Sequence, residues 1–306
     1  MTANTLTAPA QQARSGPGPL PRTALTAIAP AVWGTTYVVT TELLPPAHPM
    51  FAALLRALPA GLIALALTRR LPRGDWWWKA AVLGALNIGL FLPLLFTAAE
   101  RLPGGVAATL GAAQPMAVAL LAVPVLGQRL SGRRLLWALV GVLGVGLVVI
   151  GPRAQLDALG IAAGLGGAAS MALGVVLTKR WGRPEGVGPL ALTGWQLTAG
   201  GLLLLPTTFL FEGAPPAVDG RAALGYLWLG LVGGLLTYAL WFQGIARLPV
   251  TAAAVLGLLS PLVAAALGAL LLDQTLGAVQ LLGFALALAS IVAGQLPDRT
   301  RRPVRR

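Results

Sequence analysis

Residues 101–148 read RLPGGVAATLGAAQPMAVALLAVPVLGQRLSGRRLLWALVGVLGVGLV, and the chain contains a second copy of this stretch. With an offset of 146, it aligns without a gap on residues 247–294, RLPVTAAAVLGLLSPLVAAALGALLLDQTLGAVQLLGFALALASIVAG. The opening Arg-Leu-Pro recurs, Pro115 aligns with Pro261, and Gln128 aligns with Gln274. Each copy holds two long apolar runs, which indicates a repeated pair of membrane helices. The repeat therefore predicts a chain built from two similar halves.

The composition is that of an integral membrane protein. Of the 306 residues, 57% are hydrophobic and only 10% are charged, and the mean hydropathy is +0.79. Soluble domains carry roughly 25% charged residues, so this chain cannot cover a soluble surface. The net charge of +13 is typical of the basic cytoplasmic loops of membrane proteins. We therefore expect the lipid bilayer as a partner, and no nucleic acid.

The sequence lacks the residues that several classes of chemistry require. It contains no cysteine, which excludes a disulfide framework and metal sites held by sulfur. Its single histidine, His48, lies in a proline-rich turn and is expected to be a loop residue. No phosphate-binding loop motif occurs, and the apolar runs hold no nucleophile–base pair. We expect neither an enzyme nor a metal or cofactor site.

Ten runs of membrane-spanning length follow a polar tail at residues 1–22, which is expected to be disordered. They cover about residues 23–43, 50–68, 77–98, 104–126, 134–151, 157–178, 188–210, 222–245, 249–272 and 277–295. The connections are short, so neighbouring helices are expected to be antiparallel. This predicts an all-α integral membrane protein with ten transmembrane helices and a basic C-terminal tail at 296–306.

The distribution of lysine and arginine predicts the orientation in the membrane. With the N-terminus inside, eighteen of the 22 basic residues fall in inner segments. Outer segments hold only Arg101, Arg153 and Arg221, and Arg56 alone lies deep within a span, because Lys79 and Arg134 are at the inner ends of theirs. Because basic residues concentrate in cytoplasmic loops, both termini are expected to be cytoplasmic.

An odd number of helices in each half makes the repeat an inverted one. The halves cover residues 23–151 and 152–295, and with five helices each the second enters the membrane from the opposite side. The earlier helices match more loosely, with residues 49–65 on 189–205 at offset 140 and Leu83-Gly84 on Leu229-Gly230 at offset 146. Inverted repeats of this kind are typical of secondary transporters, which bind solute between the halves.

Glycine-rich stretches and two matched prolines shape the predicted helices. Residues 141–146 and 164–167 are rich in glycine and are expected to let helix backbones approach closely in lipid. Pro115 and Pro261 lie near the middle of the fourth and ninth runs, where each removes a backbone donor. They are interpreted either as simple kinks or as paired hinge points that line a central path, and their matched positions favour hinges.

The first helix carries a polar and aromatic stripe. Trp33, Thr36, Tyr37 and Thr40 recur at the spacing of one helix face. Polar groups that face lipid are unfavourable, so this face is expected to line the interior and to contact substrate. The alternative is structural, because threonine hydroxyls often bond to their own helix and tryptophan often serves only in packing.

Arg56 lies about two turns into the second helix, where an arginine costs roughly 2.5–3.5 kcal/mol on insertion scales. It therefore requires a partner or a water-filled cavity. Glu42 and Glu100, near the outer ends of the first and third helices, could each pair with it. Arg56 is interpreted either as a structural bridge or an arginine that snorkels outward, or as the group that recognises an anionic or carboxylate group of a substrate.

Further candidates for substrate binding are uncharged amides and aromatics in the middle of spans. Amides and aromatic rings suit an amphipathic solute, although amides also link helices to each other. They are Asn87, Gln114, Gln196, Gln243, Tyr238, Trp241 and Ser260, the repeat partner of Gln114. The acids Glu100, Asp157, Glu212 and Asp273 lie near the outer ends and are expected to be solvated.

The chain resembles the drug/metabolite transporter superfamily, and within it the ten-helix EamA type, over about residues 23–295. The resemblance is carried by Trp33-Gly34-Thr35-Thr36, Arg56, Arg101-Leu102-Pro103, Gln114-Pro115, Ser260-Pro261 and Gly127-Gln128-Arg129-Leu130. It is similar also to the branch of pigment or metabolite exporters. The family usually has glutamate where this chain has Gln128 and Gln274, so a role of that acid in proton handling is not carried over.

The resemblance implies export of small metabolites, such as amino acids or pigment-like and drug-like solutes, by alternating access across a bacterial inner membrane. A proton is one possible coupling ion, with Glu100 or Glu42 as its carrier, and facilitated efflux is the other mode. Alternatives are a translocator of lipid-linked sugars or nucleotide sugars, which the few interior positive charges disfavour, and a membrane scaffold without transport.

Overall fold

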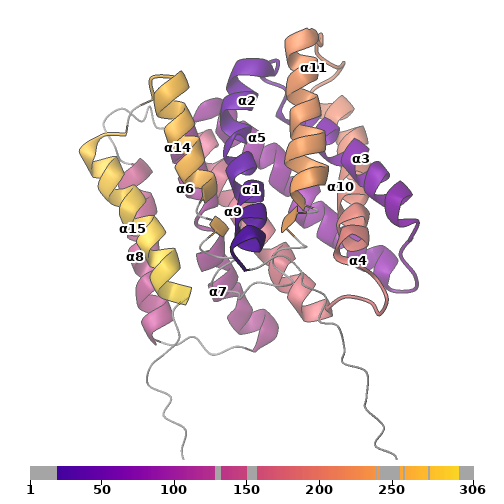
Figure 1. Cartoon of the computed structure of the whole chain (residues 1–306), viewed down its shortest axis with the longest axis horizontal. Coiled ribbons are helices and arrows are strands. Elements are labelled where there is room, and N and C mark those ends of the chain that lie inside the picture. The colour runs from indigo at the N-terminus through magenta and orange to yellow at the C-terminus, as the bar shows by residue number, and fades with distance from the viewer. Residues whose placement is uncertain are drawn as a thin grey trace, which may run out of the picture.

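The computed structural model describes residues 19–127, 132–149, 157–238, 240–241, 256–257, 259–274 and 276–295, and every regular element in these ranges is a helix (Figure 1). The first half holds α1 Pro19–Gly34, α2 Thr36–Leu43, α3 Pro49–Thr68, α4 Trp76–Gly84, η1 Ala85–Leu90, α5 Phe91–Arg101, α6 Gly104–Gly111, α7 Gln114–Leu126 and α8 Gly132–Val149. The second half holds α9 Ala158–Trp181, α10 Pro189–Phe211, α11 Gly220–Leu227, η2 Trp228–Leu236, α14 Leu259–Leu271 and α15 Ala278–Gln295.

The helices have the length and apolarity of membrane spans. Four of them are long and apolar enough to cross a bilayer, at residues 49–68, 76–101, 104–126 and 158–181, and shorter apolar helices accompany them. An all-helical chain with apolar spans is thus confirmed. The predicted runs at 222–245 and 249–272 extend into residues 242–255, outside the described part, so the count of ten helices stays a prediction. The expected tail at 296–306 lies outside it too, and α1 begins at Pro19, within the expected N-terminal tail.

Several of the predicted runs are not uniform α-helices. Thr35 separates α1 from α2, and a turn at Ala112 and Ala113 separates α6 from α7. Pro115 is the second residue of α7, where its missing N–H leaves no helical hydrogen bond unmade. Two π-helices, η1 and η2, continue α4 and α11. Wider turns of this kind are frequent at functional sites.

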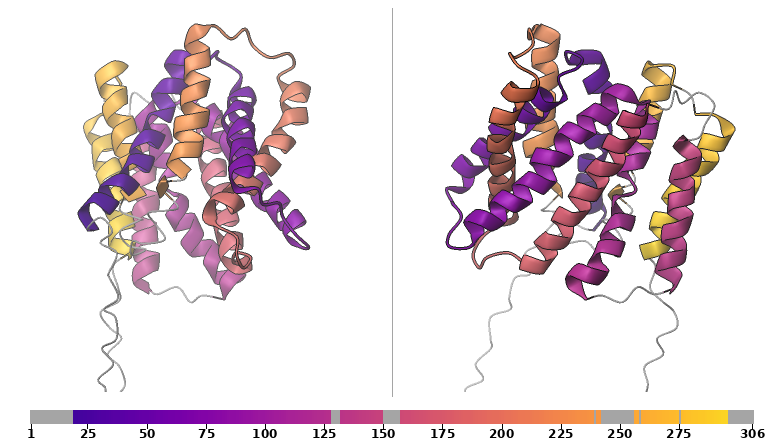
Figure 2. Two further views of the ribbon diagram at one scale, coloured as in Figure 1. Left: turned by 45° about the vertical axis from the view of Figure 1, so that its right-hand side comes forward. Right: turned by 180° about the vertical axis from the view of Figure 1, so that it is seen from behind.

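The glycine-rich stretch of α8 packs closely against α15. A Cβ atom added at Gly144 would lie 2.6 Å from the backbone nitrogen of Ala287, and one added at Gly283 would lie 2.5 Å from the carbonyl oxygen of Gly144. The two helices lie side by side at one edge of the bundle (Figure 2). Close backbone approach through small residues is the usual mode of helix packing in lipid, so the expected role is confirmed for Gly144, whereas Gly146 has open space beside it.

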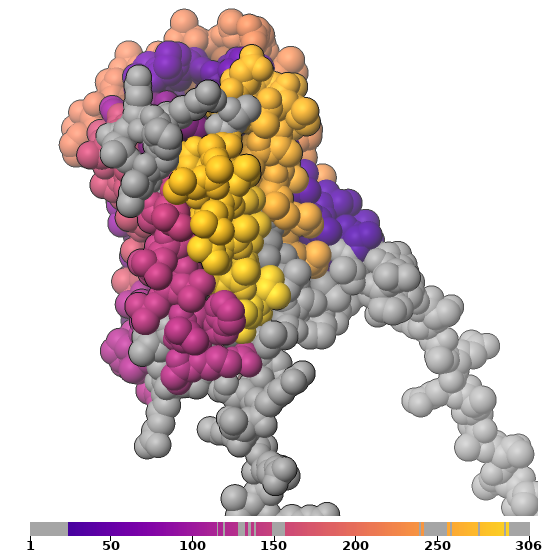
Figure 3. Space-filling view, turned by 90° about the vertical axis from the view of Figure 1, so that its left-hand side faces the viewer, coloured from indigo at the N-terminus to yellow at the C-terminus, as the bar shows by residue number. Residues whose placement is uncertain are grey.

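The outward faces of α8 and α15 are apolar. Figure 3 shows both helices side by side on the surface of the molecule. Their exposed large side chains include Leu139 and Leu143 of α8 and Leu281 and Leu282 of α15. Because soluble proteins rarely expose apolar surface of this extent, these faces are suited to contact with lipid tails.

Two acids predicted to be solvated have structural partners instead. Glu212, which follows α10, accepts hydrogen bonds from the backbone nitrogens of Met50 (2.7 Å) and Phe51 (2.9 Å) and so caps α3. Asp157 caps α9 through Gly160 N (2.7 Å) and pairs with Arg101 at 2.8 Å. The Gly160 N–H, and then the Arg101 guanidinium, hold the pKa of Asp157 below its ordinary value. The expectation that solvation alone explains Glu212 and Asp157 was therefore wrong.

Candidate solute-binding site

The carbonyl oxygen of Gly233, in the π-helix η2, is the centre of a buried polar cluster. Trp33 Nε1 donates to it at 3.0 Å, Arg56 Nη2 at 3.3 Å and Thr237 Oγ1 at 2.7 Å. Trp33 Nε1 also lies 3.0 Å from Thr237 Oγ1, and Arg56 Nη1 donates to Thr36 Oγ1 at 3.2 Å. We call Trp33, Thr36, Arg56, Gly233 and Thr237 the Arg56 cluster. It joins α1 and α2 to α3 and η2.

Small residues on both helices bring α3 close to η2. Ala53, Ala57 and Ala60 of α3 are fully buried. A Cβ atom at Gly234 would lie 3.4 Å from the carbonyl oxygen of Arg56, and one at Gly230 would lie 3.3 Å from that of Leu55. This close packing leaves Arg56 only 5% exposed.

An aromatic group adjoins the Arg56 cluster. The ring of Trp33 lies 5.7 Å from that of Tyr238 and 5.5 Å from that of Trp241, at inclined angles. Inclined rings at these separations attract one another through their quadrupoles. The structure thus brings together Trp33, Thr36, Arg56, Tyr238 and Trp241, five of the candidates predicted from sequence.

The ion pairs predicted for Arg56 are absent from the described residues. Its guanidinium contacts Thr36, Gly233 and, at 5.9 Å from the ring centroid, Phe96. Neither Glu42 nor Glu100 pairs with it, and the described ion pairs join other residues. The prediction of an acidic partner for Arg56 was therefore wrong, because a backbone carbonyl and a threonine hydroxyl take that place.

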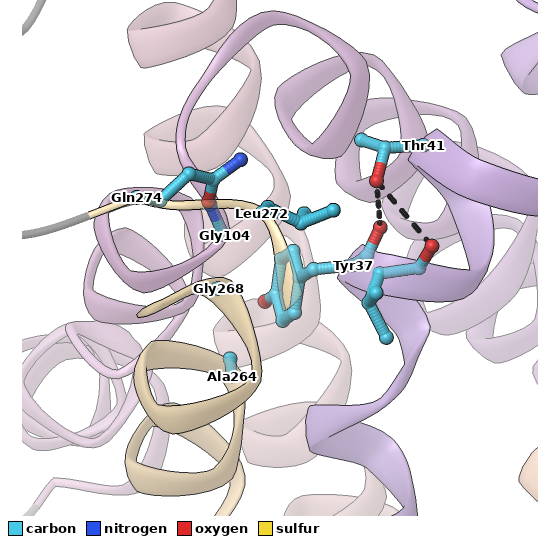
Figure 4. Close-up of a pocket in the computed structure, with 8 residues that line it drawn as sticks. Tyr37, Thr41, Gly104, Ala264, Gly268, Leu272 and Gln274 are labelled. Carbon is cyan, nitrogen blue, oxygen red and sulfur yellow. Dashed lines mark hydrogen bonds between the residues drawn. The ribbon is translucent and has the colours of Figure 1, made fainter. Parts of the chain in front are cut away.

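Tyr37 and Thr40 do not share the surroundings of Trp33. Tyr37 lines a small crevice with Gly104 of α6 and with α14, and its ring is directed toward α14 (Figure 4). Gln274 Oε1 lies in the same crevice and accepts from Gly104 N at 2.9 Å, which caps α6. Thr40 returns its hydroxyl to Thr36 O at 2.7 Å, as the structural interpretation predicted. The expected single stripe is therefore divided between two environments.

Asn87 and Gln196 form a polar pair of their own. Asn87 Nδ2 donates to Gln196 Oε1 at 2.7 Å, which joins η1 to α10. Asn87 Oδ1 is buried without a hydrogen-bond partner and faces Gly174 of α9. The pair links helices, as the alternative interpretation of these amides predicted, and it lies among α9, α10 and η1.

The remaining candidates lie at helix starts or outside the described residues. Gln114 is the first residue of α7 and is half-buried. Ser260 and Pro261 are near the start of α14, and a Cβ atom at Gly34 would lie 2.6 Å from the carbonyl oxygen of Ser260. Gly34 is therefore required for α1 to approach α14. Gln243 and Gln128 lie outside the described residues.

Sequence reasoning missed three residues of this site. Gly233 and Thr237 provide its acceptors, and Phe96, which is fully buried, lies under the Arg56 guanidinium. The adjacent Gly233-Gly234 in the middle of an apolar run, close to Tyr238, was a usable signal. The π-helix that orients the Gly233 carbonyl has no signature in hydrophobic periodicity.

The arrangement has the chemical groups that an amphipathic solute would require. It combines a permanently charged guanidinium, hydroxyl groups and three large rings within an apolar helical bundle. Sites for small molecules are mostly apolar with a few convergent polar groups of this kind. In the described residues no cluster of acids and histidine is able to hold a metal ion.

Comparisons with known proteins relate both halves to one family. The sequence profile described as "EamA-like transporter family" matches residues 22–150 and again 158–293. Protein PecM of Dickeya dadantii is 46% identical over 267 residues, which cover 87% of this chain and 90% of that protein. The probable amino-acid metabolite efflux pump of Salmonella typhimurium is 28% identical over 286 residues, covering 90% and 94% of the two chains. A solved crystal structure with 19% identity covers 91% of this chain and 97% of its own at a TM-score of 0.64, which shows a shared fold.

Proposed function

The chain belongs to the EamA-like transporter family, and from this premise we propose that it exports small organic metabolites by alternating access of two inverted five-helix halves. As a family member it is an integral membrane protein and a transporter. The bacterial relatives support a place in the inner membrane, and one of them is named as an efflux pump for amino-acid metabolites. Amphipathic solutes are the substrates that we infer.

The observation that carries the proposal is that the Arg56 cluster is shared by both matched segments. Trp33, Thr36 and Arg56 come from residues 22–150, whereas Gly233 and Thr237 come from residues 158–293. A transporter with repeats binds its solute at the interface of the halves. Movement of one half against the other would change access to this cluster from one side of the membrane to the other.

Reciprocal contacts between repeat-related residues support the inverted arrangement. At offset 140, Gly61 corresponds to Gly201 and Leu58 to Thr198. A Cβ atom at Gly61 would lie 2.6 Å from Thr198 N, and one at Gly201 would lie 2.8 Å from Leu58 Cβ. Gly61 thus meets Thr198, and their repeat equivalents, Gly201 and Leu58, meet each other in the same way. Such self-complementary contacts are those found at a two-fold axis.

The two matched prolines are proposed as hinges of this movement. Pro115 is the second residue of α7, one residue after the turn that separates α6 from α7, and Pro261 is the third residue of α14. At Pro115 we place the bend at this turn, where the helix is already interrupted and the proline prevents the two segments from joining into one helix. We also propose that both termini are cytoplasmic, because eighteen of the 22 basic residues then fall in inner segments.

A growth-rescue screen tests the proposed function. Cells that lack their own exporters would express the chain and be challenged with toxic amino-acid analogues, indole-type pigments and drugs. Trp241→Ala, which removes a ring packed on Trp33, and Gln114→Ala are expected to abolish rescue while expression persists. If no compound is rescued by the unaltered chain, export is wrong and a scaffold role is favoured. Unchanged rescue in Trp241→Ala would move the site away from this cluster, and unchanged rescue in Gln114→Ala would exclude the start of α7 from the site.

A further inference from the structure

Within the part of the chain that the structure describes, the buried guanidinium of Arg56 contacts only neutral groups. Its two hydrogen bonds, to Thr36 Oγ1 and Gly233 O, are 3.2 and 3.3 Å long. Bonds from a guanidinium to a carboxylate are shorter, at about 2.7–2.9 Å. A guanidinium has five N–H donors, and these two bonds occupy only two of them. Arg56 is therefore loosely held and retains capacity for an anionic partner.

No carboxylate of the described residues supplies that partner. The acids that the sequence offered, Glu42 and Glu100, do not pair with Arg56, and none of the described carboxylates bonds to the Arg56 cluster. An arginine remains charged inside a protein, whereas a buried charge without a partner is unfavourable. A charged residue inside a membrane span that has no oppositely charged protein partner is a candidate for recognition of a charged substrate.

The internal repeat shows what distinguishes the Arg56 position from its equivalent. At offset 140 Arg56 corresponds to Gln196, and at offset 146 Gly233 corresponds to Asn87. In the equivalent place the two side chains bond to each other, because Asn87 Nδ2 donates directly to Gln196 Oε1 at 2.7 Å. At the Arg56 position a glycine stands where the other half has asparagine. The guanidinium thus meets no side chain from this position, but only a backbone carbonyl.

The carbonyl oxygen of Gly233 already accepts hydrogen bonds from two other donors. Gly233 O accepts from Thr237 Oγ1 at 2.7 Å and from Trp33 Nε1 at 3.0 Å, both closer than Arg56 Nη2. A carbonyl oxygen has two lone pairs, which these two donors satisfy. Arg56 can therefore turn to a ligand without leaving Gly233 O unpaired.

We propose that Arg56 binds the carboxylate of a small organic anion of net charge −1, whose aromatic or apolar body lies against Trp33, Tyr238 and Trp241. This rests on the proposed function as an exporter. A carboxylate matches the planar fork of a guanidinium through two parallel hydrogen bonds. A zwitterionic amino acid would also bring an ammonium group, and no described carboxylate is bonded to the Arg56 cluster to receive it. The site therefore favours a monoanion.

The membrane potential also drives the export of a solute with net negative charge. A bacterial inner membrane is negative inside, so an anion moves outward down the electrical gradient. Each 100 mV corresponds to a concentration ratio of about 50-fold for one charge. Facilitated efflux of a monoanion thus accumulates solute outside without a proton, which removes the need for a coupling acid among the described residues of the interior.

Calorimetry on the full chain in lipid nanodiscs tests the assignment. The probes are 3-phenylpropionate, its neutral amide 3-phenylpropionamide, and phenylalanine. The variants are Arg56→Gln, Arg56→Lys and, as a matched control, Arg133→Gln, which removes another arginine that donates to a backbone carbonyl (Ala293 O, 3.0 Å). The unaltered chain and Arg133→Gln are expected to bind the acid at least about 30-fold more tightly than the amide or phenylalanine. This factor is the lower end of the losses in affinity that follow truncation of one partner of a buried charge pair.

Arg56→Gln is expected to lose this preference while it still binds the amide within about threefold, a result that a misfolded variant cannot give. Arg56→Lys keeps the charge but not the planar fork and should fall between the two. Equal binding of acid and amide by the unaltered chain, an acid preference that persists in Arg56→Gln, or no binding of any probe would overturn the assignment. The growth-rescue screen decides the proposed function separately, because it requires no particular charge on the solute.

Discussion

Alanine substitutions at Gly61 and Gly201 probe the contact between α3 and α10 from both sides. A Cβ atom at Gly61 would lie 2.6 Å from the backbone nitrogen of Thr198. One at Gly201 would lie 2.8 Å from Leu58 Cβ and 2.9 Å from Leu58 Cα. None of these atoms is the end of a flexible side chain, so the helices themselves have to separate. Both substitutions are therefore expected to destabilise the protein.

The expected decrease in the free energy of unfolding follows from two opposing effects. Overpacking of a tight interface costs about 1–3 kcal/mol, and contacts with immobile atoms place these sites near 2–3 kcal/mol. Replacement of glycine by alanine inside a helix stabilises it by about 1 kcal/mol. The net loss is about 1–2 kcal/mol for each variant, or a decrease in Tm of roughly 3–6 °C. Gly146, inside α8, has open space at its Cβ position, so Gly146→Ala should instead be stabilising by up to about 1 kcal/mol.

Thermal unfolding of the purified protein in detergent, followed by tryptophan fluorescence, provides the measurement. The two interface variants should shift Tm downward by similar amounts, because Gly61 and Gly201 occupy equivalent positions in the repeat. Gly146→Ala controls for the helix effect and should shift Tm the other way. A neutral or stabilising result at Gly61 or Gly201 would refute the reasoning from close backbone approach. Strongly unequal shifts would contradict the reciprocity of the contact.

Two further substitutions test contacts at the helix ends. Glu212→Gln removes the charge that caps α3 through Met50 N and Phe51 N. We expect the free energy of unfolding to decrease by about 1 kcal/mol and the Tm by about 3 °C. An unchanged Tm would mean that the cap contributes nothing. The pKa of Asp157 is lowered in the folded protein, so its stabilising contribution is present above its ordinary pKa and is lost as the pH falls through the lowered value. Between neutral pH and pH 3, the Tm of Asp157→Asn should therefore decrease less with falling pH than the Tm of the unaltered chain. An identical dependence of Tm on pH in the two proteins would contradict this.

The sequence predicted the helices better than the breaks within them. Long apolar runs identify helices because lipid leaves the backbone no other means of satisfying its hydrogen bonds. The π-helices η1 and η2 depend on how one turn packs against its neighbours, which periodicity does not encode. Pro115 was a signal for the break before Gln114, because proline has no backbone N–H and its ring clashes with the preceding helical turn.

The side-chain partners were harder to predict than the residues themselves. Arg56 was recognised as a site candidate from its position alone, but one of its two hydrogen-bond partners, Gly233, comes from a π-helix 177 positions away. Glu212 caps α3 through Met50 N, 162 residues earlier in the chain, a relation that no local pattern contains. Both cases follow from tertiary packing, which brings distant segments together after the helices are specified.

The sidedness of the two Arg-Leu-Pro turns tests the inverted repeat most directly. The chain has no cysteine, so Arg101→Cys and Arg247→Cys each introduce a single reporter thiol at equivalent positions of the two repeats. We predict that a membrane-impermeant maleimide labels the cysteine at position 101 in intact spheroplasts, and labels that at 247 only after the membrane is permeabilised. Labelling of both positions from the same side would contradict the inverted halves and the exporter mechanism built on them.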